Sequence, residues 1–337
     1  MPTLAPSIIK TTNKAISRAL FARAATKKGT LIKEMLICDT HADTLYAMAT
    51  NPGRKTDVTL ERLEKAGISL QTLALYVGSS ADKEEIRRFN GLMMEKLGQL
   101  MASGWRQAFD PREARDGETR FMLSIEGCEI LEDGPETVSF WREKGVRMAA
   151  LVWNYENALA SPAKHDKGQG LKPYGRDVVR EMLRLGIAPD VSHLNDRGFW
   201  DLLEMGALPV ASHSCCRALC GHCRNLTDEQ LKALFQAGGY VGVNFYPYFL
   251  NDNAECTLDT VADHVIHMME AGGEGKVGFG SDFDGIERKV PGLNNPLDVP
   301  ELIETLKKRG LTQEEVEGVA GKNLLDYYDR AFGRPQE

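Results

Sequence analysis

The sequence lacks any apolar run long enough to cross a bilayer, and it lacks an excess of basic residues. A membrane-spanning helix needs about 20 consecutive apolar residues, so we expect no membrane span. Lysine and arginine number 41 against 48 aspartate and glutamate, which gives a net charge of −7. A dominant basic face is therefore not expected, and this argues against a nucleic-acid partner.

The sequence also lacks the paired cysteines of a disulfide framework. Its seven cysteines are an odd number, and Cys215 and Cys216 are adjacent. Disulfide frameworks usually hold an even number of spaced cysteines in a secreted chain. We therefore expect reduced thiols and a cytoplasmic location.

Acidic residues are absent from residues 1–33, which carry seven lysines and arginines. The segment has no apolar core of a secretory signal, and its composition fits either a transit-like peptide or an extension outside the fold. Met35 directly precedes the first apolar run. We expect residues 1–34 to be a basic N-terminal extension that catalysis does not need, and residues 35–337 to form one domain. A chain that starts at Met35 and folds without activity would contradict this.

The rest of the chain alternates short apolar segments with helical patterns. At 42% apolar and 26% charged residues, its composition is that of a soluble enzyme with a sizeable core. The expected strands cover residues 35–38, 68–77, 120–126, 146–153, 187–193, 208–213, 240–246 and 277–282. The expected helices cover residues 83–101, 177–185, 199–205, 231–237, 258–271, 300–309 and 314–332. Two of these helices follow capping boxes, Thr227 with Gln230 and Thr312 with Glu315. Eight strands separated by helices predict a single (β/α)8 barrel of the α/β class, and a doubly wound open sheet is the alternative.

Metal-ligand side chains close five of the expected strands. In chain order they are His41 and Asp43, Glu126, His193, His213, and Asp282. In a strand, residues two apart face the same side, and the carboxyl ends of barrel strands converge on one face. Each residue alone has an ordinary explanation, such as a buried histidine, a glutamate paired with an arginine, or an aspartate in a turn. Because five separate strands end in a ligand type, we favour a shared metal site.

The composition of this set fits zinc. Zinc binds histidine nitrogen and carboxylate oxygen, and a catalytic ion keeps one position for water. Two ions that share a water lower its pKa and polarise a carbonyl group, while a further carboxylate can move protons. We therefore expect a two-metal site for hydrolysis.

The sequence from about Met35 to Phe332 resembles the membrane dipeptidase (renal dipeptidase-like) family of zinc peptidases, which have amidohydrolase-type barrels. The motifs that carry this resemblance are Asp39-Thr40-His41-Ala42-Asp43-Thr44, Ile125-Glu126-Gly127, Asp190-Val191-Ser192-His193, Ser212-His213-Ser214, Arg224-Asn225, Val243-Asn244-Phe245-Tyr246, Gly280-Ser281-Asp282-Phe283-Asp284-Gly285 and Gly321-Lys322-Asn323-Leu324-Leu325.

The resemblance implies two zinc ions per chain. His41 and Asp43 would bind one, His193 and His213 the other, and Glu126 would bridge them. A water between the two ions would hydrolyse the peptide bond of a dipeptide.

The resemblance also implies how a dipeptide is held. Arg224 resembles the family's clamp on the substrate carboxylate, a task that suits a bidentate guanidinium. Asp282, rather than Asp284, matches the family's carboxylate on strand eight and would bind the amino end or shuttle protons. Tyr246 would line the substrate pocket. An arginine and an aspartate at a fixed separation would select substrates two residues long.

One position departs from the family pattern. Well-known members carry a histidine at the end of strand four that contacts the substrate or the tetrahedral intermediate, and Trp153 stands there in this sequence. An indole donates one hydrogen bond but carries no proton near neutral pH. Either the neighbouring Asn154 takes over this contact or the step proceeds without it. His165, on the long loop 161–174, is a weaker candidate for replacing the family's histidine.

The sequence leaves other functions open. The spacing of Cys216, Cys220 and Cys223 resembles that of radical S-adenosylmethionine enzymes and could hold an iron–sulfur cluster. The same three cysteines with Cys215 and His222 could instead form a zinc knuckle. An amidohydrolase-type barrel could also act on an N-acyl amino acid, a lactam or a dipeptide with a D-residue. His264 and His267 lack the glutamate of a zincin helix, so we expect them to lie in the packing or on the surface rather than to bind a metal. Assembly into a homodimer is left open.

Overall fold

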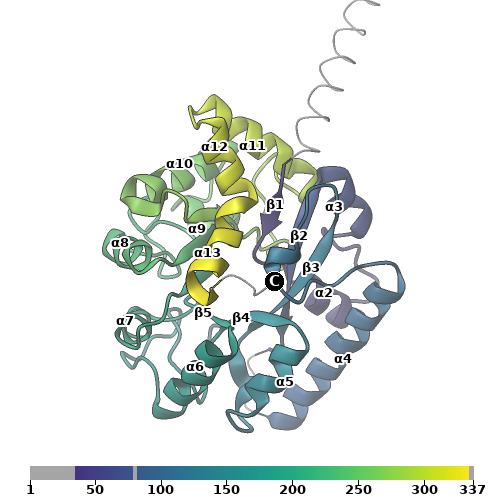
Figure 1. Ribbon diagram of the computed structural model, residues 1–337, viewed down its shortest axis with the longest axis vertical. Helices are drawn as coiled ribbons and strands as arrows, with labels where there is room; N and C mark the ends of the chain where they lie inside the picture. The colour runs from purple at the N-terminus through teal and green to yellow at the C-terminus, as the bar shows by residue number, and fades with distance from the viewer. Residues whose placement is uncertain (1–34, 79–81, 334–337) are drawn as a thin grey trace, which may run out of the picture.

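Eight parallel strands pair in chain order, and the last closes on the first (Figure 1). The structure is a computed structural model that describes residues 35–78 and 82–333. The strands are β1 (Ile37–Asp39), β2 (Ile68–Tyr76), β3 (Arg120–Glu126), β4 (Val146–Ala150), β5 (Ala188–Asp190), β6 (Val210–Ser214), β7 (Tyr240–Val243) and β8 (Val277–Phe279). The predicted (β/α)8 barrel is confirmed, and the open-sheet alternative is wrong. The prediction for residues 1–34 lies outside the described residues.

Helices surround the strands (Figure 1). They are α2 (Thr44–Thr50), α3 (Leu60–Ala66), α4 (Lys83–Ala102), α5 (Thr137–Glu143), α6 (Pro173–Leu185), α7 (Asp196–Glu204), α8 (Asp228–Ala237), α9 (Pro247–Leu250), α10 (Leu258–Met268), α11 (Val299–Lys308), α12 (Gln313–Glu317) and α13 (Asn323–Phe332). No sequence pattern predicted α2, α3, α5 or α9, each of which is seven residues long or shorter. Within the described residues, no helix combines the length and apolar character that a bilayer crossing requires.

Both predicted capping boxes form. The amide of Gln230 donates to the hydroxyl of Thr227, and the Gln230 side chain accepts from the amide of Thr227. Thr312 and Glu315 exchange the same two bonds ahead of α12. These pairs satisfy amide groups that the first helical turn leaves without partners.

The helix predicted over residues 314–332 is interrupted. A π-helical turn, Gly318–Lys322, separates α12 from α13. A Cβ atom at position 321 would lie 2.7 Å from the carbonyl oxygen of Leu36 and 3.1 Å from Sγ of Cys38. The absence of a side chain at Gly321 therefore lets this turn pack closely against the start of the barrel.

Several strands are shorter than predicted at their carboxyl ends. β5 ends at Asp190 rather than His193, and β8 ends at Phe279 rather than Asp282. The residues that follow are still buried, so their pattern resembles a strand, but their backbone turns. Oδ1 of Asp190, for example, accepts a bond from the amide of Ser192 at 2.8 Å. His193 and Asp282 thus lie in turns directly after the strands.

The core occupies two regions. The larger lies between the strands and the surrounding helices. The smaller fills the amino-terminal half of the barrel, where α13, in yellow across the strands in Figure 1, covers it with Leu324, Tyr327 and Tyr328. The hydroxyl of Tyr327 donates to the carbonyl of Leu208, and that of Tyr328 to the carbonyl of Arg147. Because one end of the barrel is closed in this way, the opposite end is left for a site.

Candidate metal centre

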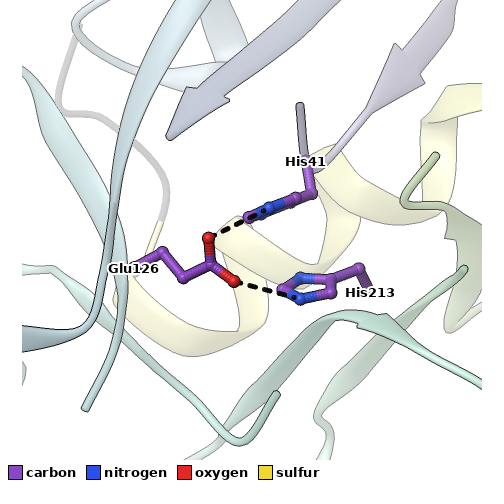
Figure 2. A group of neighbouring side chains, drawn as sticks. All are labelled: His41, Glu126 and His213. Carbon is purple, nitrogen blue, oxygen red and sulfur yellow. Dashed lines mark ion pairs between the residues drawn. The ribbon is translucent and has the colours of Figure 1, made fainter. Parts of the chain in front are cut away.

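The carboxylate of Glu126, at the end of β3, lies between three histidines. Its Oε2 atom is 3.6 Å from Nε2 of His41, and its Oε1 atom is 2.9 Å from Nε2 of His193 and 3.5 Å from Nε2 of His213. Figure 2 shows the two oxygens directed toward His41 and His213. One oxygen thus faces the β1 side of the barrel and the other faces the β5–β6 side, which is the arrangement that a bridging carboxylate needs.

Two carboxylates approach His41 as well. Nε2 of His41 lies 3.7 Å from Oδ2 of Asp43 and 3.9 Å from Oδ1 of Asp282. Within the described residues, the side chains that could hold a metal form two groups, His41–Glu126–His213 and His41–Asp43–Asp282, each with its ligand atoms within 4.8 Å of one another. The structure therefore brings together all the ligands predicted from the sequence, although their roles as ligands stay predictions.

The residues present fit a metal. Nε2 of His41 and Oδ1 of Asp43 are buried and make no hydrogen bond, and buried polar groups normally have a partner. Burial opposes the charged form of His41, yet Glu126, Asp43 and Asp282 raise the pKa of its imidazole to about 10. This cluster of acids therefore favours a positive charge among them, which a metal ion would supply.

Two residues of the centre have backbone angles that are rare for side-chain-bearing residues. His193 has φ of 69° and Asp282 has φ of 63°. Such left-handed conformations are strained and concentrate at functional sites. Gly285 permits the close approach of the acids, because a Cβ atom there would overlap Oδ2 of Asp43 and lie 2.7 Å from Oδ1 of Asp282.

Neighbouring side chains orient two of the histidines. Nδ1 of His193 lies 3.1 Å from Oδ1 of Asn154, so this nitrogen donates and Nε2 keeps its lone pair. Nδ1 of His213 lies 2.8 Å from the hydroxyl of Ser212, which in turn donates to Asp190. Both Nε2 atoms therefore face the same space, 3.1 Å apart. The structure thus gives Asn154, predicted to contact substrate, a bond to His193.

Asp282 and Asp284 have different surroundings. Oδ2 of Asp282 accepts a bond from Nδ2 of Asn244 at 3.0 Å, and burial raises the pKa of the Asp282 carboxyl. Asp284 instead accepts bonds from the hydroxyl of Thr44 at 2.8 Å and the amide of Asp57 at 2.6 Å. Asp284 therefore joins its own turn to α2 and to the loop at Asp57, whereas Asp282 lies at the centre beside His41, and its predicted role stays a prediction.

Arg224 lies buried beside the histidines. Its Nη2 atom donates to the carbonyl of His213 at 3.4 Å, its guanidinium lies 5.4 Å from the ring centroid of Phe249, and its Nε has no partner. Burial lowers the pKa of Arg224, while Glu126 and Asp282 oppose that effect. A buried guanidinium with an unsatisfied donor is suited to an anionic group.

A cavity of about 890 Å³ opens onto these groups, and Glu126, His193, Arg224 and Asp282 all line it. The predicted pocket residues Trp153, Asn154 and Tyr246 line it too, and the hydroxyl of Tyr246 donates to Glu287 at 2.6 Å. His165 is exposed and stacks on Tyr155, with ring centroids 5.0 Å apart.

The cysteines do not form a cluster. The metal-ligand groups found within the described residues contain no cysteine. Cys216 and Cys220 are buried and donate to the carbonyls of His264 and Tyr248, while Cys223 is exposed. The iron–sulfur alternative and the zinc knuckle thus receive no support.

The two histidines of α10 have partners of their own. Nδ1 of His264 accepts from the amide of Cys216 at 3.0 Å, and its Nε2 bonds the carbonyl of Leu250. His267 pairs with Asp228 at 2.8 Å. His264 is thus a buried packing residue and His267 forms a partly exposed ion pair, and neither belongs to a metal-ligand group within the described residues.

Sequence reasoning missed several residues of the cavity. Tyr46, Tyr76 and Lys164 line it, and Asn244 holds Asp282. Tyr76 ends β2, and because no histidine or carboxylate closes that strand, the sequence held no signal that its end belongs to the site. Tyr46 and Lys164 lie in segments that the sequence pattern left without an assigned element.

Two curated proteins similar to this chain are both named dipeptidases. An uncharacterized dipeptidase of Schizosaccharomyces pombe is 37% identical over 209 residues, which cover 60% of this chain and 51% of the relative. A dipeptidase of Claviceps purpurea is 34% identical over 215 residues, covering 63% of this chain and 51% of that protein. The matched segments thus span about half the length of these curated relatives.

Solved structures share the fold. A metallopeptidase from Rhodobacter sphaeroides, solved with a phosphinate mimic of the dipeptide L-Ala-D-Ala, has a TM-score of 0.82 at 24% identity, covering 89% of this chain and 100% of that one. A dipeptidase of peptidase family M19 has a TM-score of 0.82 at 26% identity with the same coverage. The sequence pattern of the membrane dipeptidases matches residues 25–331. The chain therefore belongs to the membrane dipeptidase family, peptidase family M19.

Proposed function

We propose that this protein is a zinc-dependent dipeptidase. The observation that carries the proposal is the position of Glu126, whose two carboxylate oxygens face His41 on one side and His193 and His213 on the other. Membership of a family of dipeptidases supports the reaction, and the donor set of imidazoles and carboxylates supports zinc.

In this proposal two zinc ions are held in each chain. His41 and Asp43 would hold one, His193 and His213 would hold the other, and Glu126 would bridge them. Zinc at this place would polarise the peptide carbonyl and lower the pKa of a water. Asn154 and Ser212 keep the Nε2 atoms of His193 and His213 free to bind.

The two ends of the substrate are bound by opposite charges. Arg224 holds the carboxylate of the dipeptide, since its guanidinium is buried at the cavity and has an unsatisfied donor. Asp282 receives the amino group or transfers a proton to the leaving amine, because its carboxylate lines the cavity beside the histidines. A longer peptide lacks a free carboxylate at the right distance, so the pair restricts substrates to two residues.

Metal content and a dipeptide panel test the proposal together. The full chain, purified and loaded with zinc, is expected to hold about two zinc ions and to hydrolyse dipeptides while leaving tripeptides intact. The panel includes L,L and L,D pairs, because one structural relative was solved with a mimic of L-Ala-D-Ala. Binding of iron with sulfide instead of zinc, or no hydrolysis by the zinc-loaded protein, would contradict the proposal.

A further inference from the structure

Among the charged groups nearest the histidines, the acids and the bases lie on different sides of the cavity, which Arg54 and Asp252 line as well. Asp43 and Asp282 follow β1 and β8, which are neighbours in the barrel. Arg224 follows β6, and Lys164 belongs to a loop whose Ala163 amide donates to the carbonyl of His193 just after β5. If the proposed function holds, on which this inference rests, the amino end of a dipeptide lies toward β1 and β8 and its carboxylate toward β5 and β6.

One flank between these sides is aromatic. Tyr46, Tyr76 and Trp153 line the cavity and pack on one another, with ring centroids 4.8 Å apart for Tyr46 and Tyr76 and 4.9 Å apart for Tyr76 and Trp153. They come from α2, from the last residue of β2 and from the turn after β4. We call these three residues the aromatic wall.

The aromatic wall adjoins the acidic side of the cavity. Tyr46 lies three residues, or about one helical turn, after Asp43. Tyr76 pairs with Glu126 across the β2–β3 ladder. The side chain of a dipeptide's first residue therefore falls beside this wall when its amino group lies at the acids.

The opposite flank is aromatic as well, because Tyr246, Tyr248 and Phe249 line the cavity there and pack on one another, and the hydroxyl of Tyr246 is bound to Glu287. Phe249 is only 9% exposed, and the guanidinium of Arg224 and the ring of His222 cover it at 5.4 and 4.5 Å between centres. Tyr46 and Trp153 are only partly buried, so both keep surface for a ligand. Trp153 also extends toward the metal ligands, with its ring centroid 6.1 Å from that of His193.

We propose that the aromatic wall binds the side chain of the first residue of the dipeptide, so that the protein prefers a large aromatic or aliphatic first residue. Stacked and edge-to-face rings attract one another beyond the effect of buried area. Trp153, at the place where well-known members of the family have histidine, thus acts as a specificity residue.

The test compares three dipeptides on the zinc-loaded full chain: Phe-Ala, Ala-Phe and Ala-Ala. We expect kcat/KM for Phe-Ala to exceed that for Ala-Ala by about tenfold or more, and to exceed that for Ala-Phe. Trp153→Leu and Tyr46→Leu should each lower the Phe-Ala to Ala-Ala ratio by about two- to tenfold, the range of one aromatic contact. Circular dichroism checks that each variant is folded, and the second variant keeps the test valid if the first one misfolds.

Phe140→Leu is the matched control. Phe140 is half exposed on α5 and packs on Trp141 outside the cavity, so the ratio should stay that of the unaltered protein. Equal kcat/KM for Phe-Ala and Ala-Ala, or a ratio that both folded wall variants leave unchanged, would overturn the inference alone. No hydrolysis of any of the three dipeptides would overturn the proposed function, and this inference with it.

Discussion

The hydroxyl of Ser212 lies 2.8 Å from Nδ1 of its neighbour His213. This hydroxyl donates in turn to the buried carboxylate of Asp190, whose Oδ1 also accepts from the amides of Ser192 and Ser212. The chain of bonds fixes which nitrogen of His213 carries the proton, and such outer partners commonly tune metal affinity.

Ser212→Ala should therefore weaken zinc binding. Loss of an outer hydrogen bond of this kind lowers metal affinity by about 10- to 100-fold, which competition with a chelator measures independently of activity. Ser212→Thr retains the hydroxyl and should restore the affinity. An alanine variant that binds zinc as tightly as the parent would show that the bond does not orient His213.

Glu126→Ala should abolish binding of both metals, because one carboxylate faces both sets of ligands. Zinc per chain is measured by elemental analysis on protein whose fold is checked by circular dichroism. Glu129→Gln is a matched control, since Glu129 is also buried and close in sequence but belongs to neither metal-ligand group. If the Glu126→Ala variant still held two zinc ions, Glu126 would not be the bridging ligand.

Arg224→Lys should impair binding of the substrate carboxylate. A lysine carries the charge but lacks the planar pair of donors, so we expect kcat/KM for a dipeptide to fall about 10- to 100-fold. For a dipeptide amide, which has no carboxylate, kcat/KM should fall much less. Arg217→Lys is the control, because Arg217 pairs with Asp196. An equal loss for the dipeptide and its amide would contradict the assigned role.

Glu129 should make stability depend on pH. Burial raises the pKa of its carboxyl from 4.5 to about 7, and its Oε2 atom has no hydrogen-bond partner. At pH values between 4.5 and 7, the Glu129 carboxyl is ionised in the unfolded chain but still protonated in the folded one. The free energy of unfolding therefore falls as the pH rises from about 4.5 to 7. The total effect is at most ~3 kcal/mol.

Glu129→Gln should remove this dependence. The variant is expected to match the parent near pH 4.5 and to be more stable near pH 8, by up to ~3 kcal/mol. Denaturant unfolding at the two pH values measures the difference. A constant difference between the two proteins across this range would show that Glu129 does not titrate as described.

The sequence alone determined the barrel and the set of candidate ligands. Apolar segments that alternate with helical patterns specify strands and helices locally, and the capping boxes at Thr227 and Thr312 formed as expected. Because strands of a barrel end on one face, the ligand types at their ends, such as His41 and His213, could be grouped without coordinates.

The tertiary structure decided how these groups face one another. The bond between Asn154 and His193 joins residues 39 apart, and the aromatic wall gathers rings from three elements. Neither follows from local pattern, because side-chain direction after a strand depends on turns such as the left-handed His193. The sequence thus determined which residues meet at one end of the barrel, and packing across the chain decided which atoms face the candidate metal centre and which line the rest of the cavity.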